Sequence, residues 1–307
     1  MMLVCGEALM DVFAQEDTAT GIALDARVGG SPFNVAVGLA RLGLPVAFIG
    51  GVSGDRFGRR LRAALEAEGV HLSLVQPQLA PTTLGVITAD EHGVPTYAFH
   101  GEHGADRLLS PCALHALPAG ARVLQVGSYT LVVEPVASTL RLLVERECAR
   151  LLVAYDPNVR LNVEASVPRW RAALEWMAQR AHLLKISVED AALLYRDEAV
   201  ESLARRWLAQ GVALVVVTRG GEGASAWTRA CAAHAPAVPV ALVDTVGAGD
   251  TFQAALLAWL AEHERLDGRA LAALDVEELQ ALLGFAARAA AITCGRRGAD
   301  LPRRAEL

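Results

Sequence analysis

The sequence predicts an α/β protein built around a mostly parallel β-sheet. Short apolar runs rich in β-branched residues alternate with longer helical patterns along most of the chain, and this alternation is typical of parallel strands joined by helices. With 307 residues, of which 53% are hydrophobic and 20% charged, the chain is long enough to bury a large core. We therefore expect a single α/β domain over residues 1–307.

The individual elements follow from composition and length. Buried parallel strands are short and almost entirely apolar, whereas helices are longer and repeat their apolar residues every three or four positions. The expected strands are 46–50, 123–127, 151–156, 183–186 and 212–218, and the expected helices are 33–42, 57–68, 135–147, 167–179, 200–210, 251–262 and 276–293. Ligands of such sheets bind beyond the carboxyl ends of the strands, so functional residues are expected in the loops that follow them.

Two segments do not follow the alternation of strands and helices. Residues 84–100 alternate in type and contain the turn-forming sequence Asp90-Glu91-His92-Gly93, which predicts a β-hairpin. Residues 12–28 are expected to supply further strands. We expect the segments 12–28 and 84–104 to form a small β-sheet lid over a site. The alternative is a pair of edge hairpins with no gating role.

Charge and hydropathy favour a small-molecule ligand. The net charge of −6 and the isoelectric point near 5.8 argue against nucleic acid or an anionic membrane as a partner, because both bind basic surfaces. No apolar run approaches the ~18 residues that suggest a membrane span, and the N-terminus lacks the basic start and apolar core of a signal peptide. We expect a cytoplasmic protein with no nucleic-acid or membrane partner.

The cysteines do not suggest a disulfide framework or a zinc site. They are odd in number, widely spaced and without a CxxC pair. We expect reduced, mostly buried thiols at Cys5, Cys112, Cys148, Cys231 and Cys294.

Two nucleotide-binding motifs are excluded by particular residues. Lys185 is the only lysine among the 28 lysines and arginines, and no GxxxxGK[ST] string is present, so the chain is not a P-loop nucleotidase. Residues 247–252 supply the first two glycines of a GxGxxG fingerprint but place Phe252 where a small residue must pack against the sheet. A nicotinamide-dependent dehydrogenase is therefore disfavoured.

The most informative segment is residues 244–253, DTVGAGDTFQ. It is a nearly side-chain-free loop that opens into an apolar helix, where unpaired backbone amides carry partial positive charge, and Gly247 and Gly249 allow an anion to approach them. Asp250 follows at a position where a carboxylate can accept a proton from an attacking hydroxyl. The alternative is that Asp250 only caps the helix, with Gln253 completing a capping box.

Several motifs, in order along the whole chain, resemble those of the ribokinase-like (PfkB) carbohydrate kinases. The two signature regions are residues 29–43 (GGSPFNVAVGLARLG) and residues 244–252 (DTVGAGDTF), and the resemblance extends to GEALMD at 6–11, DPNVR at 156–160, KISVED at 185–190 and VTRGGEG at 217–223. The strings at 6–11, 156–160 and 185–190 are most similar to the bacterial fructokinase branch. The resemblance implies a three-layer α/β/α sandwich with a small β-sheet lid.

The resemblance also implies roles at the phosphate. Phosphoryl transfer depends on positioning and charge neutralisation more than on covalent help, so a modest base suffices. Asp250 is expected to be that base, with the amides of Gly247, Ala248 and Gly249 as an anion hole. Arg160 is expected to hold the transferring phosphate. The alternative for Arg160 is a solvated side chain after an ordinary turn.

For the sugar, the resemblance points to the N-terminal part of the chain. Carboxylate and amide side chains can pair with neighbouring sugar hydroxyls, and glycines permit close approach. The expected sugar-binding residues are Asp11, Gly29, Gly30, Asn34 and Asp250. The alternative is an ordinary helix start, with Ser31 as its cap and Pro32 in its first turn.

For ATP, the expected residues lie after two buried strands. Lys185 offers a compact charge near phosphates, and the turn 218–223 resembles the family's ATP-binding turn, although a tight turn into the next hairpin explains its glycines equally well. The expected nucleotide-binding residues are Lys185, Thr218, Gly220, Gly223, Gly247 and Gly249.

The metal positions are the least regular part of the resemblance. Related kinases have an Asn-x-x-Glu motif for Mg²⁺, whereas this chain has Ser187 and Asp190 at the matching positions, so either Glu189 or Asp190 is expected to serve, and a helix cap at Ser187 explains the same letters. A monovalent cation such as K⁺ is implied between Asp244 and the carbonyls of Val246, Thr293, Arg296 and Gly298. The basic sequence Gly295-Arg296-Arg297 counts against that second site.

These expectations combine into an ATP-dependent sugar kinase that uses Mg²⁺, with D-fructose as the first choice of acceptor. The alternatives within the fold are kinases of 2-keto-3-deoxygluconate, ribose or a nucleoside, which would differ near Asp11, Asn34, His100 and His103. An alternative of another class is a non-catalytic sugar or nucleotide sensor. By analogy with the family, lid strands could pair between two copies in a homodimer.

Overall fold

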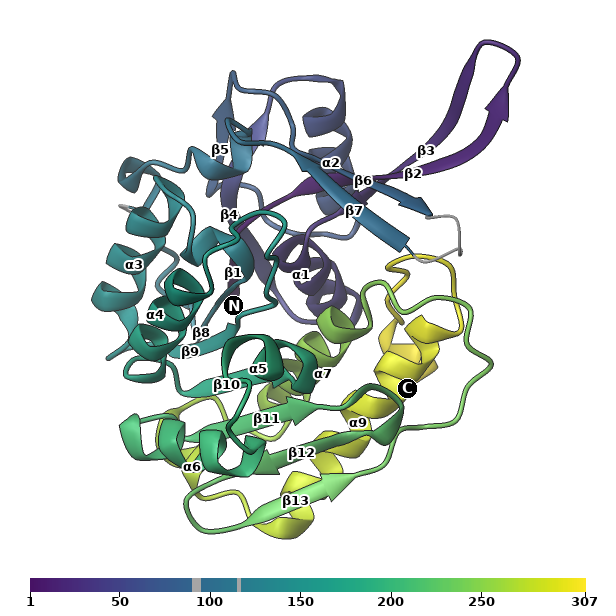
Figure 1. Ribbon diagram of the computed structural model, residues 1–307. Helices are drawn as coiled ribbons and strands as arrows, with labels where there is room; N and C mark the ends of the chain where they lie inside the picture. The colour runs from purple at the N-terminus through teal and green to yellow at the C-terminus, as the bar shows by residue number, and fades with distance from the viewer. Residues whose placement is uncertain (90–94, 115–116) are drawn as a thin grey trace.

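The computed structural model describes residues 1–89, 95–114 and 117–307, and its centre is a nine-stranded sheet (Figure 1). Neighbouring strands are parallel from one edge as far as β11, and the last two pairings are antiparallel. In spatial order the strands are β5 (Val75–Gln78), β4 (Val46–Ser53), β1 (Met2–Cys5), β8 (Val123–Gly127), β9 (Leu152–Asp156), β10 (Leu183–Ser187), β11 (Leu214–Thr218), β12 (Ala224–Trp227) and β13 (Ala232–Ala235).

Helices cover both faces of this sheet and give the expected three layers. Successive side chains of a strand point to opposite faces, and in β1 Met2 and Val4 enter one buried core whereas Leu3 and Cys5 enter the other. The first core also contains residues of α1 (Ser31–Arg41), α2 (Arg56–Ala67), α7 (Ala248–Glu262), α8 (Gly268–Ala272) and α9 (Val276–Cys294), and the second contains residues of α3 (Val136–Glu147), α4 (Val167–Ala178), α5 (Val188–Leu194) and α6 (Val200–Gln210). Short 3₁₀ segments occur at Ala105–Arg107, Pro111–Leu114, Ser128–Leu131, Gly220–Glu222 and Arg304–Glu306.

A second, four-stranded sheet is formed by the segments that depart from the βα alternation. Its order is β3 (Gly21–Gly29), β2 (Leu9–Thr18), β6 (Leu84–Ala89) and β7 (Pro95–His100). The β2–β3 hairpin projects away from the body of the molecule (Figure 1). Both predicted strand regions are therefore confirmed as strands, while the predicted turn at residues 90–93 lies outside the described residues.

The predicted strands and helices of the main layers are all present, with ends that differ by a few residues. Elements absent from the prediction are β1, β5, β12, β13, α5 and α8. Each is short, from four to seven residues, and so few residues do not establish a periodicity.

The order of the strands reverses between β1 and β8. From β1 the chain continues by way of β4 to β5 on one side, and it then returns to build β8 to β11 on the other side. Such a reversal opens a crevice beyond the carboxyl ends of the two strands. Glu7 and Ser128, which directly follow these ends, therefore lie where a ligand is expected.

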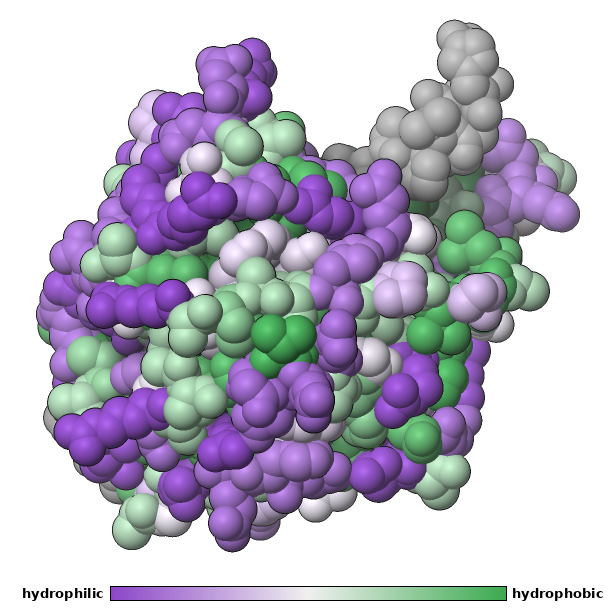
Figure 2. Space-filling model, turned by 90° about the horizontal axis from the view of Figure 1, so that it is seen from below, coloured by the Kyte–Doolittle hydropathy of each residue, from purple (hydrophilic) through white to green (hydrophobic). Residues whose placement is uncertain are grey.

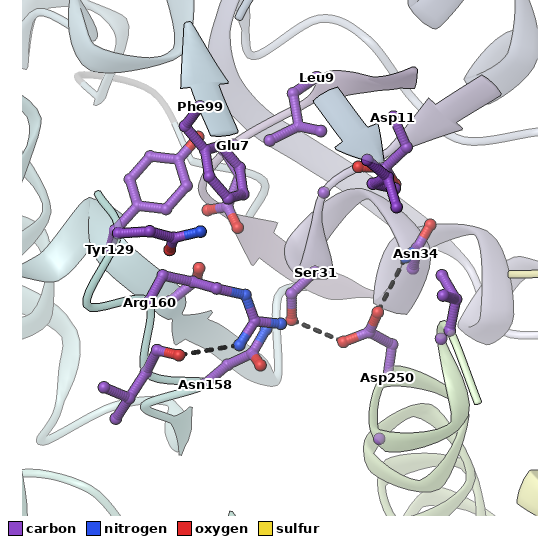
Figure 3. A pocket seen from close by; sticks show the side chains of 18 of the residues that line it. Glu7, Leu9, Asp11, Ser31, Asn34, Phe99, Tyr129, Asn158, Arg160 and Asp250 are labelled. Carbon is purple, nitrogen blue, oxygen red and sulfur yellow. Dashed lines mark hydrogen bonds between the residues drawn. The ribbon is translucent and has the colours of Figure 1, made fainter. Parts of the chain in front are cut away.

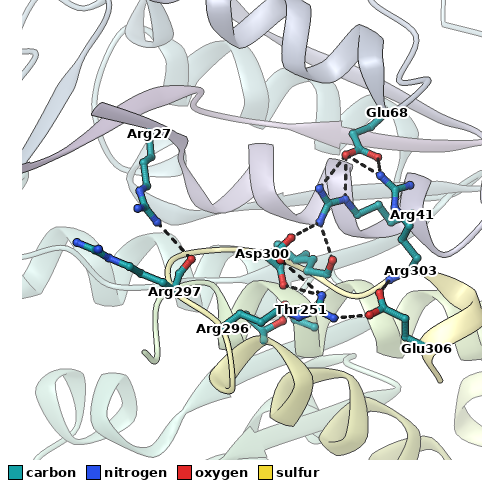
Figure 4. Close-up of polar contacts among 11 residues, drawn as sticks. Arg27, Arg41, Glu68, Thr251, Arg296, Arg297, Asp300, Arg303 and Glu306 are labelled. Carbon is teal, nitrogen blue, oxygen red and sulfur yellow. Dashed lines mark hydrogen bonds and ion pairs between the residues drawn. The ribbon is translucent and has the colours of Figure 1, made fainter. Parts of the chain in front are cut away.

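Ion pairs fix the C-terminal segment to the first helices (Figure 4). Arg41 of α1 donates to Glu68 at 2.8 Å and to Asp300 at 2.8 Å, and Arg303 reaches the same glutamate at 3.0 Å. Arg27 of β3 donates to the carbonyl of Arg297 at 3.3 Å. These contacts hold the loop after α9 beside both α1 and the small sheet.

The surface mixes residue types. Hydrophobic and hydrophilic residues are interspersed on the face shown in Figure 2. Within the described ranges, no helix combines the length and apolar character required to span a bilayer.

Cys5, Cys148, Cys231 and Cys294 are free thiols, as predicted, but only Cys5 of these is fully buried.

Candidate active site

A cavity of about 590 Å³ opens at the strand-order reversal, between the main sheet, the starts of α1 and α7, and the small sheet (Figure 3). Carboxylate, hydroxyl, amide and guanidinium groups converge on it together with a few apolar side chains. It is lined by Glu7, Leu9, Asp11, Gly30, Ser31, Asn34, Ile87, Phe99, Ser128, Tyr129, Asn158, Val159, Arg160, Leu161, Asn162, Thr245, Val246, Gly247, Gly249 and Asp250.

Asp250 lies in the first turn of α7 and points across the cavity toward α1. Its Oδ1 accepts a hydrogen bond from Ser31 Oγ at 2.7 Å and its Oδ2 accepts one from Asn34 Nδ2 at 2.8 Å. The residue that caps α7 is Gly247, with no side-chain cap, and Gln253 donates instead to Gln125 at 2.7 Å. The capping alternative for Asp250 is therefore wrong, and the carboxylate is oriented toward the cavity.

The electrostatics of this end combine two acids, Asp250 and Asp11, with two cations, Lys185 and Arg160. Burial raises the pKa of Asp250, while hydrogen bonds from Ser31 and Asn34 and the charge of Lys185 oppose that rise. Burial, followed by the charge of Asp250, raises the pKa of Asp11 to about 7, and Arg160 opposes it. A carboxylate whose pKa is raised accepts a proton more readily than an ordinary one.

The glycine-rich loop before α7 has the expected form, with one difference. Gly247 has a φ of 79°, and a Cβ there would lie 2.6 Å from that of Ala299, so only glycine fits. Gly247 and Gly249 line the cavity. Ala248 does not, and its amide already donates to the carbonyl of Thr245 at 3.2 Å. The geometry favours the two glycines over Ala248 as anion-binding positions.

Arg160 reaches the cavity from the loop after β9. Asn158 in that loop adopts a positive φ of 39°, a conformation that asparagine tolerates better than most residues. Nη1 of Arg160 donates to the carbonyl of Val159 at 2.9 Å, and its guanidinium extends toward Ser31 (Figure 3). Arg160 is thus not a solvated surface residue but a charge inside the cavity.

Lys185 occupies a different place from the one expected for a phosphate ligand. Its side chain is 5% exposed, and Nζ pairs with Asp156 Oδ2 at 2.6 Å. It does not line the cavity, but Nζ lies 3.2 Å from the position of a Cβ at Gly249. The structure places this ammonium beneath the glycine loop, where it supplies positive charge from below.

Three of the expected sugar-binding residues besides Asp250 line the cavity, namely Asp11, Gly30 and Asn34. Gly29 does not line it. A Cβ on Gly29 would lie 2.1 Å from Asp11 Oδ2, so this glycine makes room for the Asp11 carboxylate. Gly30 has a φ of 104°, and a Cβ there would lie 2.8 Å from the carbonyl oxygen of Glu7.

The expected nucleotide turn lies outside the cavity lining. Thr218 ends β11, next to Ser187 at the end of β10, and Gly220–Glu222 forms an exposed 3₁₀ turn. A Cβ on Gly223 would lie 2.1 Å from the carbonyl oxygen of Ala235. Gly223 is therefore required by the β12–β13 hairpin, whatever else it does.

The two acidic residues proposed for a divalent metal differ in placement. Ser187 caps α5 by accepting from the amide of Asp190 at 3.0 Å, which confirms the capping interpretation of that serine. Glu189 is exposed. Burial and the nearby Asp156 raise the pKa of Asp190 to about 6. Among the described residues, no group of three or more His, Cys, Asp or Glu forms a metal-binding cluster.

The residues expected around a monovalent cation meet at the base of the glycine loop. Asp244 accepts from the amides of Val246 at 3.0 Å and Gly298 at 2.8 Å, so it ties together the two loops whose carbonyls were expected to be ligands. Thr293 bonds to Thr251 through their hydroxyls at 2.8 Å. The Arg296 side chain pairs with Glu306 and Asp300.

Sequence reasoning missed several lining residues. Glu7, Tyr129 and Phe99 were not selected, and Ser31 was taken only as a helix cap, whereas Gly30 holds that position. Glu7 could have been found, because an acidic residue that directly follows a buried apolar strand is unusual. No local sequence signal identifies Tyr129 or Phe99.

A buried carboxylate, a glycine-rich helix start and an arginine around one cavity form the constellation expected for phosphoryl transfer to a hydroxyl. The sequence pattern of the pfkB family carbohydrate kinases matches residues 1–305. The chain belongs to this family and is a carbohydrate kinase.

Relatives agree with this assignment over nearly the whole chain. The chain is 35% identical over 280 residues to a fructokinase of Rhizobium leguminosarum bv. trifolii, covering 91% of this chain and 86% of the relative. It is 38% identical over 251 residues to a fructokinase of Klebsiella pneumoniae, covering 81% of each. The crystal structure of a Xylella fastidiosa fructokinase with bound ATP superposes with a TM-score of 0.90 at 26% identity, covering 99% of this chain and 96% of that one.

Proposed function

We propose that the protein is an ATP-dependent fructokinase that transfers the γ-phosphate of ATP to the primary C6 hydroxyl of D-fructose. The observation that carries the proposal is Asp250, whose two carboxylate oxygens are oriented by Ser31 and Asn34 at the mouth of the glycine loop. Similar curated proteins are named fructokinase, and one similar structure holds ATP.

In this proposal Asp250 orients the acceptor hydroxyl and accepts its proton as the phosphorus–oxygen bond forms. The two hydrogen bonds fix the direction of the carboxylate before substrate arrives, so little reorganisation is required during reaction. The amides of Gly247 and Gly249, with Lys185 beneath them, and the guanidinium of Arg160 stabilise negative charge on the transferring group.

Mg²⁺ is the proposed metal, and Asp190 and Asp156 fit it better than the exposed Glu189. Oδ1 of Asp156 is buried without a hydrogen-bond partner among the described residues, and hard divalent cations prefer carboxylate oxygens and waters. When bound, the metal would neutralise phosphate charge. Asp156 would meanwhile keep Lys185 in place through its other oxygen.

The nucleotide would lie toward the ends of β10 and β11, along the turn that contains Thr218, Gly220 and Gly223.

We propose a K⁺ site between Asp244 and neighbouring carbonyls, because Asp244 joins the two loops that would provide them. The use of ATP is consistent with a cytoplasmic location.

The four-stranded sheet is proposed to act as the lid. Leu9, Asp11, Ile87 and Phe99 reach the cavity from β2, β6 and β7, so movement of this sheet would open and close it. Ile22 and Leu24 on the projecting hairpin are each 60% exposed. These two apolar side chains are the support for pairing of hairpins in a homodimer.

The experiment is ADP release from MgATP with fructose, ribose, 2-keto-3-deoxygluconate, adenosine and tagatose, for the wild type and Asp250→Asn. We expect fructose to support the highest kcat/KM and the folded variant to lose that turnover. A different preferred acceptor would replace fructose while retaining the kinase. ATP binding without turnover of any acceptor would instead support a sensor.

A further inference from the structure

Glu7 is a buried carboxyl group at the cavity for which the proposed chemistry has no use. It lies between β1 in the main sheet and β2 in the small sheet, at the crevice where the strand order reverses. The residue is 2% exposed, yet it lines the cavity. Figure 3 shows its carboxyl group directed into the cavity, toward the side chain of Arg160.

The hydrogen bonding of Glu7 is incomplete. Ser128 bonds to the carboxyl group, but Oε2 is buried without a partner among the described residues. An unpartnered buried polar atom is costly, and most such atoms in folded proteins have a partner. Because Glu7 lines the ligand cavity, its incompletely bonded carboxyl group is a natural contact for a polar group of the ligand.

A second buried carboxyl group, that of Asp106, lies near Glu7 and affects its charge. Asp106 is buried nearby and accepts from Tyr129 Oη at 3.0 Å and from the Thr83 hydroxyl. Burial raises the pKa of Glu7 to about 8, a rise that Ser128 and the charge of Arg160 oppose and Asp106 increases. A largely neutral carboxyl group can both donate and accept a hydrogen bond, which matches the two roles of a sugar hydroxyl.

We propose that Glu7 hydrogen-bonds a hydroxyl of the sugar other than the one that is phosphorylated, and that it thereby helps to select the acceptor. The proposal rests on the fructokinase function above, because the reacting hydroxyl is assigned to Asp250. Since Glu7 lines the cavity from the segment between β1 and β2, whereas Asp250 lies on α7, it is suited to contact a part of the sugar other than C6.

The test pairs variants of Glu7 with fructose analogues that each lack one hydroxyl but retain the one at C6, such as 1-deoxyfructose, 3-deoxyfructose, 4-deoxyfructose and 2,5-anhydromannitol. In the wild type we expect one analogue to lose about 10- to 100-fold in kcat/KM, the range for removing a partner of a buried polar group. Glu7→Ala should lose a similar factor with fructose and no longer discriminate against that analogue.

Glu7→Gln retains size, a donor and an acceptor, so it should recover part of the loss. The KM for ATP should remain within about twofold in both variants, because the contact is to the sugar. Glu147→Gln is the matched control, since Glu147 is also buried, at 7% exposed, but lies on α3 outside the cavity lining. Its discrimination should equal that of the wild type.

Equal discrimination by the wild type and both Glu7 variants across all analogues would overturn the inference and leave the fructokinase proposal intact. If Glu7→Ala does not fold, Glu7→Gln carries the same comparison. If the wild type phosphorylates no sugar, the proposed function fails. The variants are then compared by calorimetric titration with fructose, where affinities equal to that of the wild type would overturn the inference.

Discussion

At the Asp250 end of the cavity each carboxylate oxygen already has a protein partner, whereas at the Glu7 end one carboxyl oxygen has none among the described residues. The first end belongs to α1 and α7, which are packed into the main core, and the second borders the small sheet. The reacting end, at Asp250, is therefore organised before substrate arrives. The recognition end, at Glu7, retains polar atoms that can hydrogen-bond to substrate.

The largest expected effect is at the organised end. Asp250→Asn preserves size but removes the proton acceptor, so kcat should fall by about 10²- to 10⁴-fold, the usual contribution of a general base. The KM for fructose should change little. Steady-state kinetics with a thermal unfolding scan measures both. A variant that retains most of its kcat would remove the assigned distinction between the two ends.

The ion pair between Lys185 and Asp156, which lies beneath the glycine loop, is tested by Lys185→Met. This substitution leaves Asp156 buried without its 2.6 Å partner, and breaking a buried pair costs about 3–5 kcal/mol. Urea unfolding measures the loss. Lys185→Met combined with Asp156→Asn should recover part of the stability. Unchanged stability in the single variant would show that the pair does not hold the loop.

Arg160→Lys retains a charge in the cavity but removes the planar donor pair. We expect kcat/KM to fall by about 10²-fold, comparable to the loss of one donor that stabilises transition-state charge. Arg169→Lys, which alters an exposed arginine on α4, is the control and should retain wild-type kinetics. Equal kinetics in the two variants would remove Arg160 from the reacting end.

A pH dependence of stability is also expected at the recognition end. The pKa of Glu7 rises from 4.5 to about 8 on folding, so the folded state keeps a proton that the unfolded chain loses. Its contribution to stability is therefore present below pH 4.5 and decreases as pH rises toward 8, at most by about 1.4 kcal/mol per pH unit.

Glu7→Gln lacks this titration. Its unfolding free energy relative to the ligand-free wild type should increase between pH 5 and pH 8, as measured by urea unfolding at each pH in that interval. Glu147→Gln is again the control and should follow the wild-type pH dependence in this interval, because its pairs with Arg146 and Arg150 lower the pKa of Glu147. A constant difference between Glu7→Gln and the wild type would contradict the buried neutral state of Glu7.

The sequence is sufficient for the main layers and for the reacting end. The predicted strands of the parallel sheet are short but almost entirely apolar runs, and the glycine loop with Asp250 is contiguous, so local pattern identifies both. The sequence is insufficient where the decisive partner is distant along the chain. The pairing of Lys185 with Asp156, the space that Gly29 provides for Asp11, and the partnerless oxygen of Glu7 depend on packing between separate elements.

The short elements illustrate the same limit. β12 and β13 are four-residue strands, and their pairing with each other determines why Gly223 must be glycine. Nothing in their composition distinguishes that requirement from a nucleotide-binding one.

The central claim is that the cavity directs the phosphate to a primary hydroxyl placed at Asp250. It is tested most directly by phosphorus NMR of the product formed by the wild type from MgATP and D-fructose. The account predicts one phosphomonoester coupled to the two protons on C6. A phosphate on a secondary hydroxyl, or release of inorganic phosphate alone, would contradict it.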